Sequence, residues 1–318
     1  MTGIQHPSTG RPGSADSAAR APFGRMLTAM ITPMTADGAL DADGAARLAT
    51  YLVDDLRNDG LVISGTTGES PTTSNDEKDR LLRAVIGAVG DRAAIVAGVG
   101  TNDTAHTIEL ARAAERAGAD GLLVVTPYYN KPPQNGLVAH FTAVADATGL
   151  PVMLYDIPAR TGTPIATESL IRLAQHPRIV AVKDAKGDLG ASSQVMLATD
   201  LVYYSGEDMV NLPMLAIGAA GFVSVVGHIV ADRLHEMIDA HTAGRVGEAL
   251  AIHRELLPVY IGVMTRTQGV ITTKAALRML GLPGGPVRPP LADATPQQVE
   301  QLRTDLVAGG VKLPNGAA

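Results

Sequence analysis

Short apolar runs alternate with longer amphipathic segments along most of the chain. The runs are rich in Val, Ile, Leu and Ala, which is typical of strands that are covered on both faces of a parallel sheet. Each gap between runs has room for one helix. The pattern predicts eight strands, at Leu27–Pro33, Leu61–Gly65, Ala94–Gly98, Gly121–Thr126, Val152–Ile157, Ile179–Lys183, Leu201–Ser205 and Gly221–Val225.

Two helix starts are marked by capping residues as well as by periodicity. Ser74 is followed three residues later by Glu77, a capping-box pattern that predicts a helix running to about residue 89. A second capping box is predicted near the end of the chain, where Thr295 is the cap and Gln298 its partner three residues later. Pro296 is the first-turn proline of the same helix. These marks support helices between and after the predicted strands.

Eight successive βα units predict an α/β fold, a (β/α)8 TIM barrel over about residues 25–240. The remainder, 241–318, is expected to form a C-terminal helical extension packed on the barrel, with three helices and a Pro/Gly loop at Leu282–Leu291. Residues 1–24 are rich in Gly, Pro, Ser and Ala and lack the apolar core of a secretory signal, so we expect a disordered N-terminal extension.

One uncharged stretch, Met209 to Val230, is long enough to span a bilayer. Asn211, Pro213 and several glycines interrupt it, which favours a buried helix followed by a strand. We therefore expect no membrane association and a cytoplasmic protein.

Composition removes several function classes. The formal net charge is −6 and the sequence shows no basic stripe, so nucleic acid is not an expected partner. The absence of cysteine excludes disulfides, thiolate zinc sites and a thiol nucleophile. The eight histidines lack metal-ligand spacing, so we expect no metal and no zinc-dependent aldolase.

Side chains at the carboxyl ends of the strands are the candidates for chemistry, because a barrel carries its active site at that face. Lys183 follows the apolar run at 179–182. It could be an ordinary exposed charge at a strand end, or a desolvated amine whose lowered pKa allows attack on a ketone. Its predicted neighbours decide between these two interpretations.

Three other strand ends supply groups that suit a keto acid. The turn at Gly65–Ser70 could hold a carboxylate with backbone amides and two threonine hydroxyls, although it could also be a structural turn. Tyr155 could move a proton at a carbonyl, and Arg160 could bind a carboxylate through two hydrogen bonds. The adjacent Tyr128 and Tyr129 follow the fourth strand and suit either the site or a subunit contact. Together these groups predict amine catalysis on a keto acid.

At this point the sequence resembles the N-acetylneuraminate lyase/dihydrodipicolinate synthase family of pyruvate-dependent aldolases, over about residues 25–310. The resemblance is to the dihydrodipicolinate (4-hydroxy-tetrahydrodipicolinate) synthase branch. It is carried by GTTGES at 65–70, TPYYNKPP at 126–133, YDIPART at 155–161, VAVKDAKGDL at 180–189, YYSGED at 203–208 and VRPPL at 287–291.

The resemblance implies that pyruvate and L-aspartate 4-semialdehyde condense to 4-hydroxy-tetrahydrodipicolinate, the first committed step of diaminopimelate and lysine biosynthesis. It implies an imine between Lys183 and pyruvate, with Tyr155, Thr67 and Tyr129 as a proton relay. Tyr129 is implied to reach a neighbouring subunit's site, in a homotetramer built from two dimers. No cofactor is implied, since the imine itself accepts the electrons.

The same resemblance assigns substrate contacts. Thr66 and Thr67 are implied to hold the pyruvate carboxylate, Arg160 the carboxylate of the semialdehyde, and the backbone at Gly206 and Val223 to line the site. Arg160 and the threonine pair favour the synthase over sugar-acid lyases of the same family, which remain the nearest alternative. A non-catalytic keto-acid-binding barrel is the alternative from another class.

Two groups of positions depart from the pattern usual in the family. Asp156 and Ala159 stand where Asn and Gly are most frequent, and Ala159 could shift Arg160. Ser70, Asn102 and Tyr128 match an inhibitor cleft at the family's dimer interface. The residues accompanying them are Asn75, Lys78 and His106, where lysine-sensitive members often carry His, His and Glu. A cation in place of neutral or acidic groups predicts weak or absent inhibition by lysine.

Overall fold

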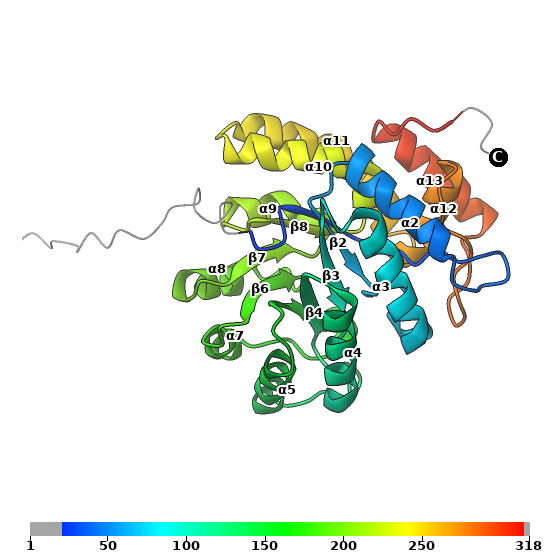
Figure 1. Cartoon of the computed structure of the whole chain (residues 1–318). Coiled ribbons are helices and arrows are strands. Elements are labelled where there is room, and N and C mark those ends of the chain that lie inside the picture. Colours follow the sequence, from blue (N-terminus) through cyan, green and yellow to red (C-terminus); the bar gives the residue numbers. More distant parts are fainter. Residues whose placement is uncertain (1–20, 315–318) are drawn as a thin grey trace, which may run out of the picture.

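The computed structural model describes residues 21–314 and shows a closed barrel of eight parallel strands surrounded by helices (Figure 1). Strands adjacent in sequence pair in parallel, and β8 closes on β1 by pairing Phe222 with Met26. The predicted fold class is confirmed. The strands are β1 (Met26–Ala29), β2 (Gly60–Ile63), β3 (Ala94–Gly98), β4 (Gly121–Val125), β5 (Val152–Asp156), β6 (Ile179–Asp184), β7 (Val202–Ser205) and β8 (Gly221–Ser224).

Each predicted strand overlaps an observed one, and the largest difference is at the end of β1. The apolar run continues to Ile31, but the backbone N–H of Ile31 donates to Nε2 of His228 at 2.9 Å instead of to a neighbouring strand. Hydrophobicity therefore persists past the strand because those residues remain buried.

The strands separate two apolar layers. Side chains such as Leu27, Val62 and Val96 fill the barrel interior, whereas the opposite faces of the strands pack against the helices. This alternation decides which residues can meet inside the barrel. The barrel helices are α2 (Ala42–Thr50, extended by the π-helix η1, Tyr51–Asp55), α3 (Asn75–Val89), α4 (Thr104–Ala117), α5 (Gln134–Asp146), α6 (Pro158–Thr161), α7 (Thr167–Leu173), α8 (Leu189–Ala198), α9 (Asn211–Ala216) and α10 (Gly227–Thr242).

The three helices predicted beyond the barrel are α11 (Val246–Met264), α12 (Gly269–Met279) and α13 (Pro296–Ala308). They pack on α10 and on one another at one side of the barrel (Figure 1). Both predicted capping boxes are present, at α3 and at α13. Dividing the chain into separate domains near residue 240 stays a prediction.

The predicted N-terminal extension lies mostly outside the described residues, in 1–20. Its last part differs from the prediction, because Phe23 is 1% exposed and belongs to the cluster inside the barrel. A single aromatic residue among Gly, Pro and Ala gives no periodic pattern, so the sequence did not reveal this anchor.

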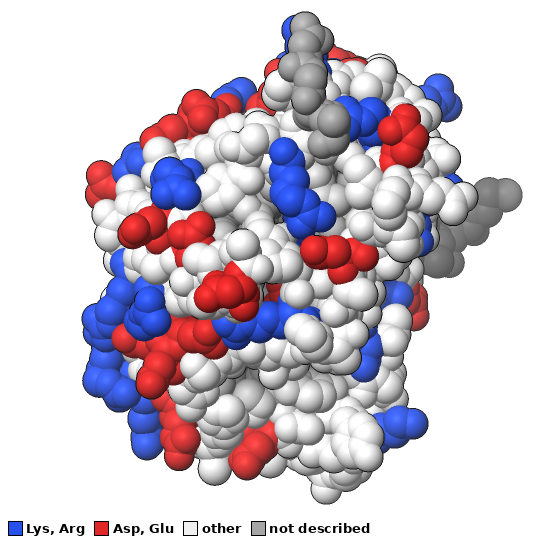
Figure 2. Space-filling view, turned by 90° about the vertical axis from the view of Figure 1, so that its right-hand side faces the viewer, with Lys and Arg blue, Asp and Glu red and all other residues white. Residues whose placement is uncertain are grey.

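The uncharged stretch at 209–230 contains the end of the 3₁₀ turn η3 (Asp208–Val210), α9, β8 and the start of α10, in agreement with the predicted helix followed by a strand. Within residues 21–314, no helix is both long enough and apolar enough to cross a membrane. On the face in Figure 2, acidic and basic side chains lie next to one another, with a broad neutral area at the lower right. That face does not present the field of a single sign that attracts polyanions.

Candidate active site

Lys183 lies on β6 and points into the barrel beside Tyr155, its register partner on β5. Its side chain is buried, with Nζ 4.2 Å from the centre of the Tyr155 ring. Burial lowers the pKa of Lys183 to about 8, while the negative charge of Asp208 opposes the shift. A usable fraction of the amine is therefore neutral near neutral pH, as an attacking nucleophile requires.

Close backbone packing holds Lys183 in this position. The N–H of Gly206 donates to the carbonyl of Asp184 at 2.7 Å. A Cβ on Gly206 would stand 2.8 Å from Cγ of Lys183, so a larger residue could not occupy this position unless the lysine moved. Val223, the other predicted backbone position, is fully buried on β8 among the side chains of the barrel interior.

Tyr155 shares a side-chain hydrogen bond with Thr66 of the turn that follows β2. Burial raises the pKa of Tyr155 to about 12, against the effects of the Arg160 charge and of this hydrogen bond. The phenol therefore stays protonated across the physiological range. The sequence named Thr67 as the relay threonine, whereas this hydrogen bond goes to the adjacent Thr66. The relay role of Thr67 stays a prediction. Thr67 is buried in the same turn.

Arg160 lies on the short helix α6, largely exposed, and its Nη1 donates to Oε1 of Gln268 at 3.2 Å. The expected effect of Ala159 on this arginine has no basis in backbone strain. Ala159 is inside the helical turn, and the left-handed conformation is taken by Gly162, with φ 75°. Any residue can adopt the helical conformation of Ala159.

A cavity of about 320 Å³ opens above the barrel between these groups. Thr66, Tyr155, Arg160 and both tyrosines of the fourth loop line it. Tyr129 is 89% exposed and has φ 72°, an uncommon conformation for a residue other than glycine. The cavity thus brings Thr66, Tyr129, Tyr155 and Arg160 together. Lys183 is not one of its lining residues, but its Nζ lies 4.2 Å from the ring centre of Tyr155, which is.

Three residues near the site received no role from the sequence. Glu207 and Asp208 act electrostatically on Lys183, and burial raises the pKa of Glu207. Both follow the carboxyl end of β7, and this position could have marked them as candidate site residues in the sequence. Gln268 is 108 residues from Arg160 in sequence, and no local pattern connects the two.

Asp156 faces the helices instead of the barrel interior, since it follows Tyr155 on the same strand. Its Oδ1 accepts from the N–H of Ile165 at 3.2 Å, and Oδ2 lies 3.5 Å from Nζ of Lys186. Burial raises the pKa of Asp156 to about 6, and Lys186 opposes this. The aspartate that replaces the expected asparagine therefore has a cationic partner outside the site.

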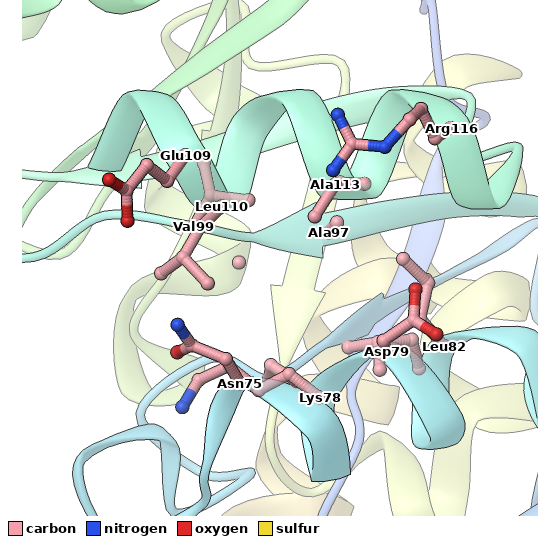
Figure 3. A pocket seen from close by; sticks show the side chains of 14 residues that line it. Asn75, Lys78, Asp79, Leu82, Ala97, Val99, Glu109, Leu110, Ala113 and Arg116 are labelled. Carbon is pink, nitrogen blue, oxygen red and sulfur yellow. The ribbon is translucent and has the colours of Figure 1, made fainter. Parts of the chain in front are cut away.

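The residues compared with an inhibitor cleft lie around the N-terminal ends of α3 and α4. Nζ of Lys78 donates to the carbonyls of Ser70, at 2.8 Å, and Thr73. His106 Nε2 and Asn75 Oδ1 are 3.2 Å apart. Asn75 and Lys78 also line a pocket of about 230 Å³ between the two helices (Figure 3). Asn102 and Tyr128 are the other two residues of the comparison. The carbonyl of Asn102 accepts a hydrogen bond from Asn130 at 2.9 Å, and Tyr128 is half-buried.

No group of three or more His, Cys, Asp or Glu side chains in residues 21–314 is arranged to hold a metal. The ionisable groups around Lys183 are instead a phenol, a guanidinium and two carboxylates. This set can bind an anionic carbonyl compound and move protons at its carbonyl.

Known proteins with similar sequences and structures share this architecture. The model of the Dihydrodipicolinate synthetase family matches residues 22–308. The 4-hydroxy-tetrahydrodipicolinate synthase 2 of Streptomyces coelicolor is 67% identical, covering 93% of this chain and 99% of the relative. The 4-hydroxy-tetrahydrodipicolinate synthase of Acidothermus cellulolyticus is 71% identical, covering 91% and 94%.

Among solved structures, the DHDPS of Cyanidioschyzon merolae with lysine bound is 40% identical, with a TM-score of 0.89 over 92% of this chain and 99% of that chain. Dihydrodipicolinate synthase from Thermotoga maritima is 33% identical, with a TM-score of 0.86 over 90% and 98%. The family model and these relatives cover the barrel and nearly all of the C-terminal helices. The chain belongs to the dihydrodipicolinate synthetase family.

Proposed function

We propose that this chain carries out the 4-hydroxy-tetrahydrodipicolinate synthase reaction through a Schiff base at Lys183. The observation that supports this most directly is the buried amine, which lies 4.2 Å from the Tyr155 ring centre and has its pKa lowered to about 8. A neutral amine inside the barrel, next to a protonated phenol, is suited to attack a ketone and to lose water afterwards.

The first half of the reaction uses pyruvate. Its carboxylate binds at the turn that carries Thr66 and Thr67, and the amine of Lys183 adds to the ketone carbon. Tyr155, hydrogen-bonded to Thr66, delivers the proton with which the hydroxyl leaves as water. The resulting imine loses a proton from the methyl carbon and becomes an enamine.

The second half uses L-aspartate 4-semialdehyde, whose carboxylate binds Arg160 at the rim. The enamine carbon attacks the aldehyde, which takes up a proton and becomes the 4-hydroxyl group. The amino group of the semialdehyde then attacks the imine carbon, closes the ring and releases Lys183. One water is released overall, and no cofactor is needed because the imine is the electron acceptor.

Tyr129 supports a functional oligomer. Its side chain is 89% exposed in one chain while its loop lines the site cavity. A second copy of the chain would cover this ring and receive it beside Tyr155, which makes a dimer the minimum active unit. We propose a homotetramer of two such dimers, located in the cytoplasm.

The test combines turnover with chemical trapping. Pyruvate-dependent turnover with the semialdehyde is followed by coupling the product to its NADPH-dependent reductase, beside a parallel assay with N-acetylmannosamine. Borohydride added with pyruvate is expected to label Lys183 and to abolish turnover. Turnover with the sugar alone would move the assignment to a sister aldolase, and failure to label Lys183 would exclude the imine.

A further inference from the structure

A second buried lysine lies close to the site, although the proposed reaction does not use it. Lys274 on α12 is fully buried, and its Nζ lies 2.5 Å from Oε1 of Glu69, whose side chain is 1% exposed. Nζ also donates to the carbonyl of Pro286 at 2.7 Å. The other carboxylate oxygen of Glu69 accepts from the backbone N–H of Arg288 at 2.8 Å. The C-terminal extension therefore holds Glu69 from two sides.

Glu69 belongs to the turn that carries Thr66 and Thr67. Its N–H donates to the carbonyl of Thr66 at 3.2 Å, and the preceding Gly68 accepts from Thr32 Oγ1 at 2.6 Å. Glu69 has φ 54° and ψ 37°, the left-handed region that is unfavourable for a residue with a side chain. Such a conformation persists only where surrounding contacts hold it, and these conformations cluster at functional sites.

Stability alone does not explain the ion pair. Removing two charges from water costs about as much as their attraction returns, and apolar residues of similar volume are often equally stable. The contacts of Glu69 do fix the position of the turn, because they join it to α12 through Lys274 and to the loop at Arg288. The guanidinium of Arg288 continues the connection to Glu77 of α3 and to the carbonyl of Thr72.

We propose that Lys274 is a positioning residue for the first substrate: through Glu69 it fixes the turn that presents Thr66 and Thr67 to the pyruvate carboxylate. The C-terminal extension thus takes part in the reaction without touching substrate. This inference rests on the proposed function, since it assumes that pyruvate binds at that turn.

The test measures how much pyruvate is needed for half-maximal borohydride labelling of Lys183. In Lys274→Met we expect that concentration to rise about tenfold or more, because displacements below 1 Å at a binding group have effects of this order. Labelling at saturating pyruvate should remain close to that of the unmodified chain. The KM for the semialdehyde should change less than about twofold, since its carboxylate binds at Arg160.

Two further variants separate positioning from folding. Glu69→Met/Lys274→Met replaces the pair with apolar side chains and leaves no buried charge, so we expect it to fold and still to show the raised pyruvate requirement. Leu302→Ala removes a fully buried side chain from α13, far along the extension, and should lower stability without changing that requirement.

The outcomes are distinct. An unchanged pyruvate requirement in the folded double variant, or a change in Lys274→Met no larger than in Leu302→Ala at equal thermal stability, would overturn the positioning role. Absence of pyruvate-dependent labelling of Lys183 in the unmodified chain would instead overturn the proposed function. Labelling in the unmodified chain together with a raised requirement in both lysine variants supports both.

Discussion

Two lysines are buried in the part of the molecule that the structure describes, and different groups surround their amines. Lys274 is in contact with the carboxylate of Glu69 and a backbone carbonyl, whereas Nζ of Lys183 faces the ring of Tyr155. Among residues 21–314, no carboxylate lies within ion-pair distance of Lys183. Asp208 influences it only from farther away, since its oxygens accept from Ser224 and from the N–H groups of residues 225 and 226.

Burial lowers the pKa of both amines, but only at Lys274 does a bonded carboxylate oppose it. A buried amine becomes a nucleophile only when it is left without a partner that holds its proton. The two amines therefore differ in reactivity because of the group beside each one, a carboxylate at Lys274 and a phenol ring at Lys183, and not because of burial.

The strongest test of this comparison exchanges each lysine for methionine. Lys183→Met should reduce turnover by at least about 10³-fold, because the covalent step is lost, while the free energy of unfolding stays the same or rises. Lys274→Met should lower the free energy of unfolding by about 3–5 kcal/mol, because it leaves Glu69 buried and unpaired. Coupled turnover and urea unfolding measure the two effects.

Lys312→Met is the matched control, since Lys312 is exposed near the end of the described chain. It should change neither quantity. If Lys183→Met proved as destabilising as Lys274→Met, the idea that Lys183 lacks a stabilising partner would be wrong.

The sequence predicted Lys183 and the barrel for the same reason: both depend on local patterns. Alternating apolar runs determine the strands, and a lysine at the end of such a run is visible without any knowledge of distant residues. The sequence does not show which of the adjacent Thr66 and Thr67 faces Tyr155; the side-chain hydrogen bond goes to Thr66, and the relay role of Thr67 stays a prediction.

Lys274 and Gln268 were not predicted, because their partners are far away in sequence. Glu69 and Lys274 are separated by 205 positions, and neither pattern nor propensity indicates that α12 packs over the turn after β2. Lys274 in isolation resembles any lysine on an amphipathic helix. Contacts of this kind depend on tertiary packing, which determines where the extension lies on the barrel.

The pH dependence sharpens the comparison. The pKa of Lys183 lies near 8, so the neutral amine becomes more abundant as pH rises toward that value. The rate of borohydride labelling at low pyruvate should therefore increase from about pH 6, pass its midpoint near pH 8 and level off above about pH 9. Tyr155, with its pKa raised to about 12, should give no decline in this range. A midpoint near the value of free lysine, about 10.4, would contradict the effect of burial.

A smaller effect is expected from the other contact made by the extension. Gln268→Ala removes the hydrogen bond to Arg160, which lies at 3.2 Å on an exposed group. The KM for the semialdehyde should rise about two- to fivefold, the value of one exposed hydrogen bond, with the KM for pyruvate unchanged. Gln175→Ala, at an exposed glutamine before β6, serves as the control. Equal changes in both KM values would show that Gln268 acts on the whole site and not on Arg160.

The smallest effect concerns a third lysine of intermediate type, Lys78. Its pKa is lowered to about 8 by burial, yet its ammonium already donates to the carbonyls of Ser70 and Thr73. Free lysine would have to bring another cation to this cleft, so half-inhibition of turnover should require more than about 1 mM lysine. Combining Lys78→Ala with His106→Glu removes one cation and adds a carboxylate, and should tighten inhibition by up to about fivefold, the usual limit for an exposed ion pair. Turnover of both chains across a lysine titration measures this, and submillimolar half-inhibition of the unmodified chain would show that Lys78 does not occupy the position where the inhibitor's cation binds.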